Sequence, residues 1–128
     1  MSKTTHRILV VEDDPELNRL MGELLSASGY QALCAKNGAA GLEILFSGFR
    51  PHLIILDWLM PNLSGEQFLH EMYLRPQFRD IPVIVISGTK DIRRILQHRD
   101  EVRLVLEKPV SLDQILRAIE IILTDSEV

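Results

Sequence analysis

The chain has 128 residues, of which 46% are hydrophobic and 25% are charged, and its formal net charge is −4. This composition is typical of a globular protein with a sizeable core, and the mild charge gives no electrostatic reason to expect direct binding to nucleic acid or to a membrane. The single cysteine, Cys34, cannot form an internal disulfide, which favours a reducing, cytoplasmic setting. No apolar run as long as a signal peptide or a membrane span follows the start of the chain. We therefore expect one domain over residues 1–128.

Short apolar segments alternate with longer amphipathic ones along the whole chain. In the first pair, the apolar run at 7–11 is followed by 15–28, where leucines recur at helical spacing until Gly29 ends the helix. Two later helices open on capping boxes, at Ser64 and at Ser111. The same reasoning predicts strands at 7–11, 30–35, 52–57, 82–87 and 102–107, and helices at 15–28, 39–47, 64–74, 90–98 and 112–123.

Five strand–helix pairs in succession predict parallel strands that are joined by right-handed crossovers. The predicted strands at 52–57 and 82–87 are apolar without alternation, which is typical of strands covered on both faces. The fold class is therefore α/β, with a single doubly wound five-stranded parallel sheet. In sheets of this kind, binding sites lie at the carboxyl ends of the strands.

Polar and charged side chains stand at these predicted strand ends. Carboxylates at neighbouring strand ends repel one another, but together they form an oxygen-rich pocket that suits Mg²⁺. A hydroxyl group and a lysine nearby are the groups that hold phosphoryl oxygens, and a carboxylate can itself be the nucleophile that forms an aspartyl phosphate. The residues at the ends of the first, third, fourth and fifth strands are Glu12, Asp13 and Asp14, then Asp57, then Ser87, then Glu107 and Lys108.

Four motifs occur in order at the strand ends, "VVEDD", "LDWLMPNLSG", "VIVISG" and "LEKPV". Together they resemble the receiver domain of two-component response regulators, and the resemblance runs from the first strand to the last helix. It implies the (βα)₅ flavodoxin-like receiver fold, with Asp57 as the phosphorylated aspartate. It also implies a Mg²⁺ site in which Asp13 is a direct ligand, Glu12 acts through water, and Leu59 supplies its backbone carbonyl.

The resemblance assigns roles to the later motifs as well. Ser87 would bond a phosphoryl oxygen, Lys108 would pair with Asp57 or its phosphate, and the peptide bond before Pro109 would be cis. The implied function is a phosphorylation-dependent signalling switch, not an enzyme beyond promoting its own phosphorylation and dephosphorylation. The implied partners are a histidine kinase or phosphotransfer protein, and a downstream protein or output domain.

Two other classes of function fit the residues at the strand ends less well. A phosphatase with an aspartyl-phosphate intermediate would need an acidic residue two positions after Asp57, where the chain has Leu59. A flavin-binding domain would need a phosphate loop after the first strand, where "EDDP" would repel a phosphate. A degenerate receiver that binds proteins without phosphorylation remains the alternative.

Several notable residues have ordinary structural interpretations. Asp14 is expected to be a solvated residue at the start of the first helix, and Trp58 to be partly exposed packing beside the site. None of the histidines has ligand spacing with another, so surface or packing positions are expected for His6, His52, His70 and His98.

The predicted output region departs from the receiver pattern. Val105 stands three positions before the lysine, where receivers commonly have an aromatic residue that moves inward on activation, and no Gly-Ala pair precedes the last strand. We therefore expect phosphorylation to alter residues 88–101 most, and any phospho-dependent homodimer to use this face. Ile92, Ile95 and Leu96 could form an apolar stripe there, although at least two of them are expected to pack on the sheet.

Overall fold

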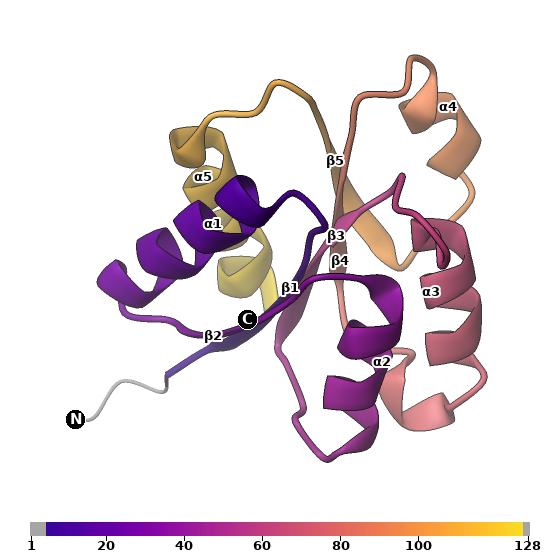
Figure 1. Ribbon diagram of the computed structural model, residues 1–128, viewed down its shortest axis with the longest axis horizontal. Helices are drawn as coiled ribbons and strands as arrows, with labels where there is room; N and C mark the ends of the chain where they lie inside the picture. Colours follow the sequence, from indigo (N-terminus) through magenta and orange to yellow (C-terminus); the bar gives the residue numbers. More distant parts are fainter. Residues whose placement is uncertain (1–4, 127–128) are drawn as a thin grey trace.

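The computed structural model describes residues 5–126. Five parallel strands form one sheet in the order β2-β1-β3-β4-β5, with helices on both sides (Figure 1). The predicted fold class is therefore confirmed. The elements in chain order are β1 (Arg7–Val11), α1 (Pro15–Ala27), β2 (Gln31–Ala35), α2 (Gly38–Phe46), β3 (Leu53–Asp57), α3 (Gly65–Tyr73), the 3₁₀ turn η1 (Pro76–Phe78), β4 (Val83–Ser87), α4 (Ile92–Leu96), β5 (Val102–Glu107) and α5 (Leu112–Ser126).

The two faces of the sheet carry separate apolar cores. Helices α1 and α5 cover one face, and α2, α3 and α4 cover the other (Figure 1). Alternation along β1 sends Ile8 and Val10 to the first core and Leu9 and Val11 to the second. Every residue of β3 and β4 is buried, as their unbroken apolar pattern predicts. Within the described part of the chain, no helix has the length and apolar character needed to cross a membrane.

The largest departure from the predicted elements lies between β3 and β5. Helix α4 has only five residues, against the nine expected at 90–98, and Asp91 precedes it in the left-handed conformation with φ 65° and no side-chain cap. The turn η1 was not predicted, because "PQF" has no periodicity to read. Ile92 and Leu96 pack on the sheet, whereas Ile95 is 58% exposed.

Trp58 corrects another prediction, because it is buried, not partly exposed. Helix α3 begins directly over its indole ring. A Cβ on Gly65 would lie 2.7 Å from Cε3 of Trp58, so this close approach requires glycine. The Gly65 N–H also donates to the Trp58 carbonyl at 2.8 Å, which closes the loop after β3.

The His52 side chain links the amino-terminal end of β3 to β1 by a hydrogen bond. Its Nδ1 accepts a hydrogen bond from the Arg7 N–H at 2.9 Å, which a protonated ring could not do. Burial, followed by the positive charge of Arg7 and the ring of His6, lowers the pKa of His52 below its ordinary 6.5. The neutral imidazole is therefore part of the fold.

This bond predicts a loss of stability in mild acid. Because the pKa of His52 is lower in the folded state, the folded protein binds fewer protons than the unfolded chain, and the free energy of unfolding falls as the pH drops below 6.5. Between pH 7 and pH 5, urea unfolding should show that the wild type loses more stability than His52→Gln, by on the order of 0.5 kcal/mol. The exposed control His70→Gln should behave as the wild type, and an equal loss in His52→Gln would contradict the assignment.

Candidate functional site

The acidic loop after β1 is held in place by its own backbone. Glu12 is the first residue beyond the strand, and its Oε2 accepts a hydrogen bond from the Asp14 N–H at 3.0 Å. Asp14 itself caps α1, accepting from the N–H groups of Glu16 and Leu17, as expected of a helix-start residue. Glu12 therefore points inward while Asp14 stays at the surface.

Asn18 is a supporting residue that the sequence analysis missed. Its side-chain amide donates to the carbonyls of Glu12 at 3.1 Å and Ala35 at 3.0 Å, so it joins the ends of β1 and β2. The sequence does hold one indication of this role, because Asn18 lies in the second turn of a predicted helix, where asparagine is unfavourable unless its side chain has a hydrogen-bond partner.

Asp57 ends β3 beside β1 and β4. Its carboxylate is 3% exposed. The next residue, Trp58, continues the pairing with β4, because its N–H donates to the Ile86 carbonyl at 3.0 Å. The loop then turns through Asn62, which has φ 70°. Leu59 lies in this loop with its side chain 63% exposed.

Lys108 reaches the carboxylates from β5. The peptide bond between Lys108 and Pro109 is cis, as the resemblance implied, and the Lys108 N–H donates to the Ser87 carbonyl at 2.9 Å. Its Nζ lies 3.4 Å from Oδ1 of Asp57 and 3.7 Å from Oε1 of Glu12. One partly exposed lysine thus pairs with two buried carboxylates.

Ser87 is buried at the end of β4, next to Lys108 along the same edge of the sheet. Its Oγ accepts a hydrogen bond from the Thr89 N–H at 3.0 Å. Among the described residues it makes no hydrogen bond to Asp57. The hydroxyl is therefore at the strand end, where the sequence placed it, and is bonded to the backbone of the next loop.

The charges of this cluster are unbalanced. Burial, followed by Asp13 and Glu12, raises the pKa of Asp57 to about 8. Burial also raises the pKa of Glu12, while hydrogen bonding to Asp57 lowers that of Asp13. Burial lowers the pKa of Lys108, but the Glu12 and Asp57 charges outweigh it and raise that pKa. One lysine is too little positive charge for three carboxyl groups.

The same carboxyl groups could hold a metal ion. One oxygen atom from each of Glu12, Asp13 and Asp57 lies within 4.8 Å of the other two. Within residues 5–126, Oδ2 of Asp57 is buried without a hydrogen-bond partner, and Oε1 of Glu12 has only its 3.7 Å ion pair with Lys108, which leaves acceptors unsatisfied. Hard oxygen donors with this geometry suit a divalent cation such as Mg²⁺.

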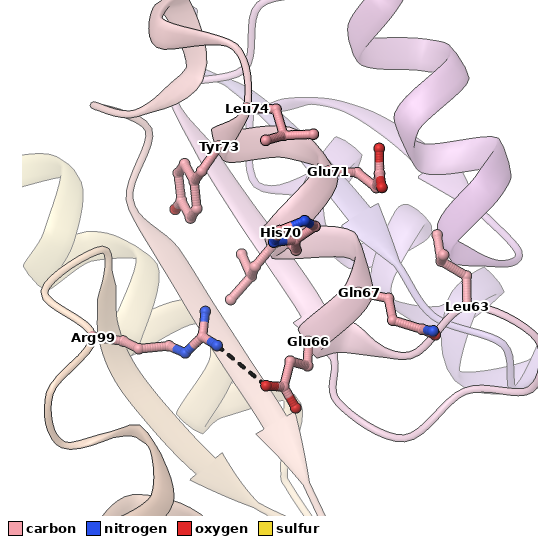
Figure 2. Close-up of a pocket in the computed structure, with 9 residues that line it drawn as sticks. Leu63, Glu66, Gln67, His70, Glu71, Tyr73, Leu74 and Arg99 are labelled. Carbon is pink, nitrogen blue, oxygen red and sulfur yellow. Dashed lines mark hydrogen bonds and ion pairs between the residues drawn. The ribbon is translucent and has the colours of Figure 1, made fainter.

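A separate groove of about 600 Å³ runs along the outer side of α3 (Figure 2). An ion pair spans it, with Nη2 of Arg99 3.4 Å from Oε1 of Glu66. None of its lining residues belongs to the acidic cluster. The groove therefore connects α3 with the loop between α4 and β5, away from the strand ends.

Comparison with known sequences agrees with this geometry. The family model described as response regulator receiver domain matches residues 8–120. Protein PilH of Pseudomonas aeruginosa is 31% identical over 119 residues, which are 91% of this chain and 97% of PilH. The response regulator DivK of Brucella anthropi is 32% identical, over 93% of this chain and 97% of DivK.

Some relatives are much longer. The sensor histidine kinase TmoS of Ectopseudomonas mendocina is 35% identical over 106 residues, which are 82% of this chain but 11% of TmoS. The hybrid signal transduction histidine kinase D of Dictyostelium discoideum is matched over 8% of its length. The chain therefore spans about a tenth of these two kinases.

Solved structures show the same fold. The signal receiver domain of a histidine kinase from Syntrophus aciditrophicus superposes with a TM-score of 0.81 at 29% identity, covering 94% of this chain and 92% of that one. The response regulator TrrA of Thermotoga maritima, solved in complex with Mg²⁺ and BeF, gives a TM-score of 0.78 at 30% identity, covering 92% and 99%. The chain belongs to the response regulator receiver domain family.

Proposed function

We propose that Asp57 accepts a phosphoryl group from a phosphohistidine and that the domain over residues 1–128 acts as a phosphorylation-dependent switch. The observation that carries this proposal is the buried Asp57 carboxylate, which has one oxygen 3.4 Å from Nζ of Lys108 and the other without a hydrogen-bond partner. Membership of the receiver family supports the same role.

In this proposal a carboxylate oxygen of Asp57 attacks the phosphorus of the donor. The new bond joins oxygen to phosphorus, the phosphorus–nitrogen bond of the donor breaks, and the released imidazole takes a proton from solvent. Lys108 and the Ser87 hydroxyl hold the phosphoryl oxygens on the product. In the proposed hydrolysis, water attacks the phosphorus, the same oxygen–phosphorus bond breaks, inorganic phosphate leaves and the carboxylate is restored.

Glu12, Asp13, Asp57 and the Leu59 carbonyl would hold Mg²⁺ beside the phosphoryl group. When bound, this ion offsets the charge of the carboxylates and of the phosphoryl oxygens. The unsatisfied oxygens of Glu12 and Asp57 support this site. The complex of TrrA with Mg²⁺ and BeF offers a precedent at 30% identity.

The partners follow from the same chemistry. A histidine kinase or a phosphotransfer protein would supply the phosphoryl group, and a downstream protein or output domain would read the switch. We place this exchange in the cytoplasm. A degenerate receiver is less well supported, because all the groups needed for phosphoryl transfer are present.

The conformational response is proposed to centre on residues 88–101. Ser87 is bonded to the Thr89 N–H, so movement of its hydroxyl toward a phosphoryl group would pull directly on the loop before α4. That helix is short, and its exit is linked to α3 by the ion pair between partly exposed Arg99 and exposed Glu66. Such exposed pairs contribute about 0–1 kcal/mol, so the segment can rearrange at small cost.

Phosphorylation should require Asp57. Incubation with acetyl phosphate and Mg²⁺ should add one phosphoryl group to the wild type by intact mass, and none to Asp57→Asn or to the wild type in EDTA. Asp13→Ala should need about tenfold more Mg²⁺ for the same rate, because it loses a charged ligand. The exposed control Glu43→Ala should behave as the wild type, and equal labelling of Asp57→Asn would refute the assignment.

Without a divalent ion, Asp57→Asn should be more stable than the wild type. The pKa of Asp57 is raised to about 8 in the folded state, so the folded protein holds a proton that the unfolded chain releases near 3.8. The wild-type free energy of unfolding therefore falls as the pH rises from 4 to 8, and the variant escapes this fall. In EDTA its advantage should grow with pH and exceed about 1 kcal/mol at pH 8, by urea unfolding. The exposed control Asp80→Asn should show no such trend, and a constant difference would contradict the stated charge balance.

Activation should change protection mainly in residues 88–101. Amide hydrogen exchange with Mg²⁺, with and without beryllofluoride, should show its largest difference there, because Ser87 and Thr89 connect the site to this segment. Asp57→Asn serves as the control and should show no difference. Changes confined to α1, α2 or the surroundings of Val105 would overturn this account of the switch.

A further inference from the structure

Four arginines gather at the amino-terminal end of the sheet, the end opposite the acidic cluster. One starts β1, one precedes β3, and two flank η1. None forms an ion pair with a carboxylate within residues 5–126, whereas most of the other described arginines do. The four are Arg7, Arg50, Arg75 and Arg79.

Three of these guanidinium groups are anchored by backbone carbonyls. Nε of Arg7 donates to the Arg50 carbonyl at 2.8 Å, and Nη1 of Arg50 donates to the Gln77 carbonyl at 2.6 Å. Nε of Arg79 donates to the Tyr73 carbonyl at 3.1 Å. Each guanidinium carries five N–H groups, so most donors stay available in a side chain that is already positioned.

The fourth guanidinium is held by an aromatic ring. The Cζ atom of Arg75 lies 3.8 Å from the centroid of the Phe46 ring, which in turn stacks on Phe78 at 6.1 Å. Phe46 is nevertheless 43% exposed, and Leu74 beside Arg75 is 60% exposed. The positioned guanidinium group of Arg75 therefore lies beside the exposed apolar side chains of Phe46 and Leu74.

A cavity of about 270 Å³ lies between the end of α2 and η1. In Figure 1 the end of α2 lies at the bottom of the view. Phe46, Phe49 and Leu45 supply apolar walls, and Arg50 and Arg75 stand at the same hollow. A single apolar side chain could enter it while carboxylates on either side meet the guanidinium groups.

We propose that the surface around this cavity binds an acidic peptide segment of a partner protein, with one apolar side chain in the cavity. We name it the arginine–aromatic surface, and its residues are Phe46, Arg50, Arg75, Phe78 and Arg79. Carboxylates complete the hydrogen bonding of positioned guanidinium groups that have no acidic partner among the described residues. Arg50 and Arg75 line one small hollow, and the whole chain has charge −4, which disfavours a long polyanion such as nucleic acid.

This binding is independent of the phosphorylation switch. The arginine–aromatic surface lies before β3 and after α3, whereas Asp57 lies at the far end of β3. None of its residues belongs to the 88–101 segment. The two sites can therefore be tested separately.

The test is a titration of the ¹⁵N-labelled chain, followed by two-dimensional NMR, with the peptide Glu-Glu-Leu-Asp-Asp. Amide shifts should change saturably in residues 45–50 and 74–79, and the neutral peptide Gln-Gln-Leu-Asn-Asn should leave them unchanged. Arg75→Gln should weaken binding about fivefold, because it loses one charge-assisted contact, and within residues 5–126 the Arg75 side chain makes no hydrogen bond on which the fold depends. The matched control Arg103→Gln, at an exposed arginine on β5 that forms no ion pair with any described residue, should bind as the wild type.

Each other outcome overturns the proposal. Shifts that are absent or centred elsewhere would show that the surface does not bind acidic peptides. Equal weakening by Arg75→Gln and Arg103→Gln would indicate nonspecific charge attraction. Stronger binding of a single-stranded oligonucleotide of equal charge would make nucleic acid the occupant. Asp57→Asn should bind the peptide as the wild type does, so failure of the phosphorylation proposal leaves this result unaffected.

Discussion

The excess of negative charge over positive charge at the carboxyl end of the sheet is the constraint around which this structure is organised. Glu12 and Asp57 are buried, with Lys108 as the cation that pairs with both. Buried carboxylates of like charge are costly unless a cation or a proton offsets them. The oxygens of Glu12 and Asp57 that lack a hydrogen-bond partner within residues 5–126 reflect the same imbalance, because an excess of negative charge favours the binding of a cation.

The rest of the fold holds these charges at short range. Parallel strands bring the ends of β1, β3, β4 and β5 to one edge, and hydrogen-bonded loops then limit their freedom. Asn18 joins the acidic loop to β2, and Gly65 closes the loop after Asp57 over Trp58. Preorganisation of this kind lets a site bind ions without first ordering its ligands. The loop after Ser87 is bonded to the site through the Thr89 N–H, which donates to the Ser87 hydroxyl, and this bond connects the site to the segment proposed to move.

The sequence predicted most of the fold because the hydrophobic periodicity of each segment agrees with the residues that begin and end it. Unbroken apolar runs marked β3 and β4, and serine-led capping boxes marked α3 and α5, where the structure has both reciprocal bonds. The acidic cluster was predictable for the same reason, since strand ends in a parallel sheet meet. What could not be predicted depends on tertiary contact. Burial of Trp58 follows from the approach of Gly65, and the bonds of Asn18 follow from the position of β2. The short α4 follows from a left-handed Asp91 that no local pattern indicates.

The backbone conformation of Asp91 costs conformational free energy. A residue other than glycine at φ 65° sits in a sparsely populated region, although aspartate tolerates it better than most residues, and it keeps this conformation without a compensating cap hydrogen bond. The loop before α4 thus stores a small amount of conformational free energy at Asp91. A rearrangement that returned Asp91 to an ordinary conformation would recover that energy, so the strain would favour the proposed response of residues 88–101. The proposed return step would have to restore the strain.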